Sequence, residues 1–73
     1  MKPTLLKNVK KHNCFTLTDK VKYNEEGEVL SKYVYVRGDY EKSSKKYEVY
    51  KFDDVNDYRF LKGDRIVFVD FCF

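Results

Sequence analysis

Short runs of β-favouring residues, separated by polar turns, follow one another along the chain. The strongest runs are residues 33–40, 47–52 and 65–73, and shorter ones occupy 14–17 and 58–61. Tyr, Val, Phe and Ile dominate these runs, and such side chains favour pleated, half-buried surfaces. The pattern predicts an all-β protein: a small five- to six-stranded antiparallel rolled sheet or SH3-like barrel, with an OB-type barrel as the second choice. Closure removes the edges that an isolated small sheet would otherwise expose.

The last run is apolar on both faces of the expected strand. Val67, Val69, Phe71 and Phe73 alternate along it with Ile66, Phe68, Asp70 and Cys72. Successive side chains of a strand point to opposite sides of the sheet, so both sides of this strand carry apolar groups. We therefore expect residues 65–73 to form a long strand inside the sheet.

Turn-forming residues mark the boundaries between the runs. Gly27 ends a polar Asn-Glu-Glu-Gly segment and is predicted to adopt a positive φ at a hairpin tip. Gly38 lies inside a strand run and predicts a bulge or a close backbone approach. Residues 53–57 are rich in Asp and Asn and predict a turn. Lys62-Gly63-Asp64 predicts a second tight turn, with glycine at its flexible position.

The length of 73 residues corresponds to one domain, 1–73. Residues 1–13 form a basic lead-in, whose Leu5, Leu6 and Val9 are expected to dock on the body of the domain. Residues 19–31 are expected to form a peripheral hairpin or loop.

Aromatic residues are the most abundant large apolar groups of the chain. Seven Tyr and six Phe are present, and Ala is absent. Because aromatic rings bury large areas, we expect them to supply most of the core of so small a domain.

The net charge is small, but it is distributed unevenly. The chain carries 15 basic and 12 acidic side chains, for a formal charge of +3. Residues 1–22 contain six Lys and one Asp, whereas residues 52–73 contain three basic and five acidic groups. This charge permits an anionic partner but is weaker than the basic signature of typical nucleic-acid-binding domains.

The two cysteines do not form a disulfide framework. Cys14 and Cys72 lie in apolar runs and are expected to be buried free thiols of a cytosolic protein. The first 15 residues lack the apolar stretch of a secretory signal. No apolar run approaches the ~20 residues that span a bilayer. We therefore expect a cytoplasmic location and no membrane partner.

Candidate chemistry is sparse. No phosphate-binding glycine loop, dinucleotide fingerprint or HExxH zinc motif is present. His12, Cys14 and Cys72 supply too few ligands for zinc. His12 and Cys14 are spaced for one strand face, but no oxyanion site accompanies them. The acidic residues of 53–57 lack EF-hand spacing. We expect no enzyme, no cofactor and no metal.

Several segments share one recognisable character, namely residues 6–11, 35–40, 43–47, 50–56 and 60–65. They total 30 of the 73 residues, spread over 6–65, and resemble a group of small uncharacterised proteins of phages and mobile elements of gut bacteria. The resemblance implies a mobile-element setting and supplies no activity and no catalytic residues. The members of that group carry a glycine where His12 stands here.

A basic and aromatic set is the strongest candidate binding surface. Its members are Tyr33, Tyr35, Arg37, Lys45, Lys46, Tyr47 and Lys51. Two uses of this set remain open. It fits a protein-interaction module or adaptor that uses a sheet face or an edge strand, with edge-strand self-association as a variant. It also fits a nucleic-acid-binding module, in which rings stack on bases and cations meet phosphates. Of the two, the protein-interaction module is the expected function.

Overall fold

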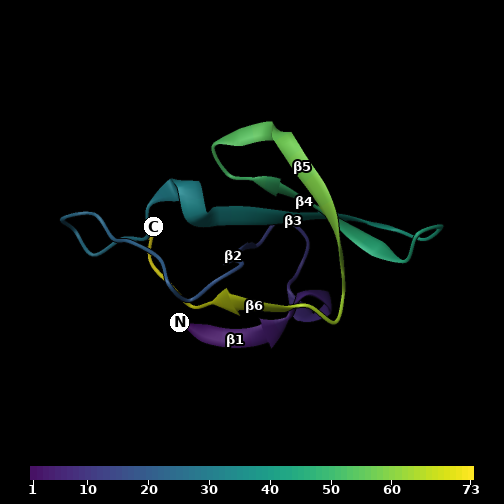
Figure 1. Ribbon diagram of the computed structural model, residues 1–73, viewed down its shortest axis with the longest axis horizontal. Coiled ribbons are helices and arrows are strands. Elements are labelled where there is room, and N and C mark those ends of the chain that lie inside the picture. The colour runs from purple at the N-terminus through teal and green to yellow at the C-terminus, as the bar shows by residue number, and fades with distance from the viewer.

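The computed structural model describes residues 1–73 and shows one open sheet of six antiparallel strands, without any α-helix (Figure 1). The strands are β1 Lys2–Leu5, β2 Cys14–Thr16, β3 Val34–Glu41, β4 Lys46–Lys51, β5 Asp54–Lys62 and β6 Ile66–Val69. Their order across the sheet is β1-β6-β2-β3-β4-β5, so β1 and β5 form the two edges. The predicted all-β fold with five to six antiparallel strands is confirmed.

The sheet is rolled around one small core. Leu6, Val9, Phe15, Val49 and Val67 form a cluster of buried side chains. Val49 lies on β4 and Val67 on β6, and two strands separate these in the sheet order. The two side chains join one cluster only because the sheet curves back on itself. The face that carries Phe15, Val49 and Val67 is the inner face, and the opposite side is the outer face.

The core is aliphatic, and the prediction that aromatic rings fill it is wrong. Phe15 is the only buried ring among the thirteen, whereas six valines and Leu6 are buried with it. The rings classed as exposed are those of Tyr23, Tyr40, Phe52, Tyr58, Phe60 and Phe73. The inside of a narrow rolled sheet has little volume per residue, so valine fits it better than a ring does. Most rings therefore lie on the outside or at the rims.

The last strand is shorter than predicted. β6 pairs with β1 on one side and β2 on the other, which confirms its place inside the sheet. It ends at Val69, because Asp70 has a φ of 62°, outside the extended region. Residues 70–73 then run as a tail, in which the Cys72 carbonyl accepts a hydrogen bond of 2.6 Å from the Val29 N–H.

The N-terminal strand β1 was not predicted, because Pro3 and the flanking lysines interrupt any apolar alternation. Proline is tolerated on an edge strand, where its missing N–H faces solvent. After β1, the 3₁₀ turn η1 (Leu6–Asn8) carries Leu6 into the core, and Val9 follows. The docking predicted for the lead-in is therefore confirmed for Leu6 and Val9, whereas Leu5 ends β1 and is only partly buried.

Two glycine predictions are confirmed. Gly27 has a φ of 79°, in a hairpin held by the isolated bridge between Tyr23 and Val29. The β3–β4 register shifts between Arg37 and Tyr40, which is the predicted bulge. A Cβ at Gly38 would stand 3.1 Å from the Glu48 carbonyl oxygen, so the backbones approach closely as well.

His12 provides a test of backbone strain before β2. It has a φ of 73°, a conformation that costs a non-glycine residue roughly 1–2 kcal/mol. The conformation is held because the His12 N–H donates to the Arg37 carbonyl at 2.8 Å. His12→Gly removes the strain but gains flexibility in the unfolded chain, so we expect the free energy of unfolding to rise by about 0.5–1 kcal/mol in urea titrations.

The matched control for His12→Gly is Asn13→Gly, one residue further on. Asn13 has no positive φ. The glycine there relieves no strain and only loosens the unfolded chain, so it is expected to lower stability. A His12→Gly protein no more stable than the parent would contradict the strained turn.

Candidate interaction surface

Four members of the predicted surface share the inner face. Tyr35 pairs with Lys51 across β3 and β4, and Arg37 pairs with Val49. Residues opposite each other on antiparallel strands project to the same side of the sheet. Tyr47, two positions from Val49, projects there too. The sheet therefore brings together Tyr35, Arg37, Tyr47 and Lys51.

The two tyrosines of this face are covered rather than open. The Arg37 guanidinium lies over the Tyr47 ring, 4.4 Å from its centroid, and Arg59 lies 5.5 Å from the centroid of Tyr35. Both rings are half-buried and pack against the core cluster. Such cation–π pairs occupy ring faces that a nucleobase would need. This part of the inner face is a packed layer and not a stacking platform.

The other three members lie elsewhere. Tyr33 is the last residue of the 3₁₀ turn η2 (Ser31–Tyr33), which directly precedes β3. Lys45 occupies the β3–β4 turn with a φ of 55°. Lys46 pairs with Glu41 on the outer face. The seven residues therefore do not form one continuous surface.

The edge strand β5 is the most exposed element of the sheet. Figure 1 shows β5 at one margin of the sheet, with β4 as its neighbour and no strand beyond it. All of its nine residues except Leu61 are exposed. Val55, Tyr58 and Phe60 are large apolar residues with exposed fractions of 66%, 58% and 42%. An edge of this length and composition is a ready template for pairing with another chain.

The sequence pattern missed this edge. Residues 53–57 were predicted to interrupt the β structure, but β5 already begins at Asp54, after a tight turn at residues 52–53. Only the apolar run at 58–61 indicated a strand here, and it predicted a shorter strand than β5. The side on which a strand lacks a neighbour depends on strand order, which local patterns do not contain.

Part of β5 has no partner within the chain. Tyr50 pairs with Tyr58 and the next pair is Lys51 with Asp54, so residues 55–57 are extra on the β5 side. The Asn56 N–H donates to the Asp54 carboxylate at 3.1 Å. Residues 55–57 thus form a bulge that stands opposite no residue of β4.

Aromatic rings continue from the edge onto the outer face of the β4–β5 hairpin. Tyr58 and Phe60 meet edge to face, with ring centroids 6.1 Å apart. Tyr50 lies opposite Tyr58 on β4. Rings of this kind supply large contact areas at protein interfaces. The edge and these rings form the candidate interaction surface, defined as Val55, Tyr58 and Phe60 with the backbone of β5.

The opposite edge of the sheet is less suited to pairing. β1 has only four residues and contains Pro3. Short edge strands and proline both hinder the addition of another strand. This contrast singles out β5.

The charged side chains of β5 form no ion pair within the chain. The one ion pair of the structure joins Lys11 and Asp39. The hydrogen bond from the Lys11 ammonium lowers the pKa of Asp39. Hydrogen bonds from Ser43 likewise lower the pKa of Glu41. The charged side chains of β5, in contrast, are all exposed. They follow one another along the strand in the order Asp54, Asp57, Arg59 and Lys62.

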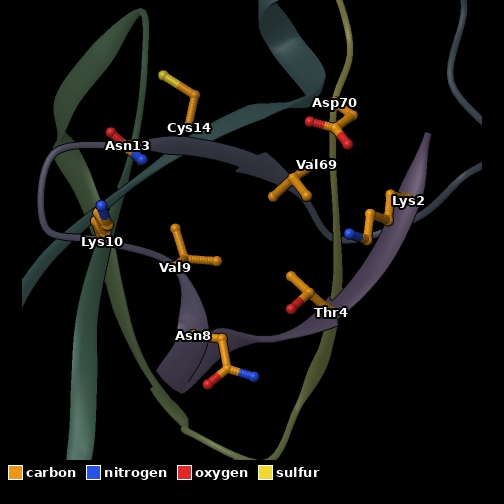
Figure 2. Close-up of a pocket in the computed structure, with 9 residues that line it drawn as sticks. All are labelled: Lys2, Thr4, Asn8, Val9, Lys10, Asn13, Cys14, Val69 and Asp70. Atoms are coloured by element: carbon orange, nitrogen blue, oxygen red, sulfur yellow. The ribbon is translucent and has the colours of Figure 1, made fainter.

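A separate hollow of about 430 Å³ lies near the N-terminal strand (Figure 2). Val9 and Val69 line it together with Lys2, Lys10 and Asp70. Figure 2 shows the Cys14 side chain directed away from these two valines. Burial raises the pKa of the Cys14 thiol, so it stays protonated near neutral pH and is a poor nucleophile.

Neither a metal centre nor a disulfide is formed. No three side chains of His, Cys, Asp or Glu gather closely enough to hold a metal ion. Both cysteines are free, but Cys72 is exposed and Cys14 is only partly buried. The prediction of two buried thiols is therefore wrong, because Cys72 follows the end of β6 and lies in the tail.

Comparison with family models, curated proteins and solved structures found no match to this chain. The resemblance to small phage and mobile-element proteins therefore stays a prediction. No helix of the structure has the length and apolar character needed to cross a membrane.

Proposed function

We propose that the protein is a non-enzymatic interaction module, and that β5 receives an extended protein segment by strand addition. The observation that carries this proposal is the nine-residue edge strand with Val55, Tyr58 and Phe60 exposed on it. In this mode, main-chain hydrogen bonds provide affinity, and alternate side chains provide specificity.

The charge of the edge favours a protein partner over a nucleic acid. Asp54 and Asp57 balance Arg59 and Lys62, so β5 has no net charge. Binding of phosphates needs an excess of cations, since release of counterions drives it. A polypeptide strand needs no such excess.

The finer class of the fold belongs to the same proposal. We propose that the rolled sheet is an SH3-like barrel that stays open between β1 and β5. The packing of Val49 against the cluster that contains Val67 supports this, since it brings β4 toward β6 across the roll. An open seam in such a barrel leaves β5 free for a partner.

One observation supports the alternative of nucleic-acid binding. A hollow of about 320 Å³ is lined by Lys46, Lys62 and Arg65 together with Phe60. Three cations beside an exposed ring suit a phosphate and a stacked base. Asp64 lines the same hollow and opposes this use.

Selection of peptides from a displayed random library tests the proposed function. We expect wild-type protein to enrich extended apolar peptides, whose binding shifts the amide resonances of β5. Tyr58→Lys is expected to weaken their binding at least tenfold, because it removes a central contact at the edge. Tyr23→Lys, which changes an equally exposed ring in the 23–29 hairpin, is the control and should leave binding unchanged.

The result that overturns the proposed function is a set of peptides that bind elsewhere, or that bind both variants alike. A labelled single-stranded oligonucleotide, titrated at low and high salt, separates the alternative. Salt-sensitive binding lost in Lys62→Ala would favour the nucleic-acid function.

A further inference from the structure

We infer that β5 pairs with β5 of a second copy of this chain, antiparallel, about a twofold axis at Tyr58. The inference rests on the proposed function, because it names the strand that occupies the β5 edge. The result is an isologous dimer, the commonest form of closed assembly. Its two sheets would join into one across the pair of edges.

The order of charges along β5 is complementary to itself in this arrangement. Residues equally far from Tyr58 on either side become partners across the axis. Asp57 then faces Arg59 of the second copy. Symmetry repeats this contact, so two opposite-charge pairs form. Within one chain neither side chain has an ion-pair partner.

The apolar residues of the edge pair in the same register. Val55 meets Leu61 of the second copy, and the two Tyr58 residues meet at the axis. Val55 is the most exposed of the large apolar residues of the chain. Burial of apolar surface is the general driving force for association. This register would bury the apolar surface that is most exposed in the single chain.

The faces of the strand agree with this pairing. Arg59 pairs with Val49 in the chain and therefore projects to the inner face. Asp57 and Arg59 flank Tyr58, so both project to the side opposite Tyr58. Partners across an antiparallel pair share a face, so Asp57 and Arg59 of the two copies meet on the inner side.

Neighbouring symmetric registers lose this complementarity. An axis at Asp57 places two aspartates opposite each other, and an axis at Arg59 places two arginines opposite each other. Like charges directly opposite are destabilising. An axis between two residues, on either side of Tyr58, pairs no acid with a base. The sequence thus selects one register.

A further feature of the single chain is satisfied by the second copy. Residues 55–57, which oppose nothing on β4, would gain residues 59–61 of the second copy as partners.

Sedimentation equilibrium with charge-reversal variants tests the pairing. An interface of one strand per copy is small, so we expect wild type to pass from monomer to dimer between about 10 µM and about 1 mM. Asp57→Arg and Arg59→Asp each place like charges across the axis, and each is expected to remain monomeric. An equimolar mixture of the two variants restores opposite charges at every contact and is expected to form a heterodimer.

Controls separate the pairing from damage to the fold. Asp19→Arg and Lys20→Asp make the same charge changes outside β5 and should leave dimerisation unchanged. Arg59 also covers Tyr35, so Asp57→Arg carries the test alone if Arg59→Asp fails to fold. Asp57→Arg is then expected to remain monomeric, and Asp57→Lys to behave in the same way.

A wild type that stays monomeric at about 1 mM, or single variants that dimerise as wild type does, would overturn the self-pairing. The proposed function would survive that result if selected peptides still bind β5. If the peptides fail and the mixture of variants associates, the edge serves only self-association. The two failures are therefore distinguishable.

Discussion

Phe15→Ala is expected to lower the free energy of unfolding by about 3–5 kcal/mol, the largest effect of any single substitution considered. Phe15 is fully buried and touches the cluster of Leu6, Val9, Val49 and Val67. Removing its ring leaves a cavity that valines on strands of a rolled sheet cannot close. Small domains have total stabilities of about 5–15 kcal/mol, so most of the fold's margin would be lost. Urea unfolding followed by circular dichroism measures the change.

Phe60→Ala is the matched control for Phe15→Ala. The Phe60 ring lies on exposed β5 and touches Tyr58 at its edge. Its removal is expected to cost no more than about 1 kcal/mol. Equal losses for the two variants would show that rings outside the cluster also carry the fold, contrary to the structure.

Gly63→Ala is expected to lower the free energy of unfolding by about 1–3 kcal/mol, the second largest effect. A Cβ at this position would stand 2.8 Å from Cε2 of Tyr47 and 3.1 Å from Cβ of Lys7. The Lys7 N–H also donates to the Gly63 carbonyl at 3.0 Å, which holds the two segments together. The methyl group must push the β5–β6 connection away from η1 or displace the Tyr47 ring. Thermal and urea unfolding give the loss.

Gly27→Asn is the control for Gly63→Ala. Gly27 has a positive φ, which asparagine tolerates better than most residues, and a Cβ there would meet nothing within 4 Å. We expect a loss below about 1 kcal/mol. A Gly63→Ala protein as stable as the parent would contradict the close packing of this turn. The glycine would then serve only the flexibility that the sequence predicts.

Local patterns predicted the central strands well. Residues 33–40 and 47–52 were predicted, and β3 and β4 lie within one residue of those bounds. Alternation of apolar and polar residues is strong there, since each strand has neighbours on both sides. The bulge at Gly38 was also predicted from a local feature, the glycine itself. Because Gly38 has no Cβ, the backbone of Glu48 can approach it closely.

The edges were predicted poorly, because pairing with a neighbour overrides weak local preference. β1 contains Pro3, and the start of β5 contains Asp and Asn, so neither resembles a strand by composition. β1 forms because β6 offers it a complete row of partners, from Lys2 opposite Val69 to Leu5 opposite Ile66. These contacts join residues far apart in sequence, which a local pattern cannot report.

The candidate site was predicted only in part. Of the seven predicted residues, the structure joins Tyr35 and Arg37 of β3 to Tyr47 and Lys51 of β4, and it leaves Tyr33, Lys45 and Lys46 elsewhere. The pattern could not tell the inner face from the outer one, and Arg59, which covers Tyr35, comes from a strand two places away. The exposed edge depends on strand order and was therefore out of reach.

Tyrosine exposure measured residue by residue tests the central claim, which places an aliphatic core inside and the rings of the edge in water. The chain has seven tyrosines and no tryptophan, so photochemically induced nuclear polarisation with a flavin dye reads these rings separately. In dilute, monomeric protein the account predicts strong signals from Tyr23, Tyr40 and Tyr58 and weak ones from Tyr35 and Tyr47. Strong signals from Tyr35 and Tyr47, with Tyr58 silent, would contradict it.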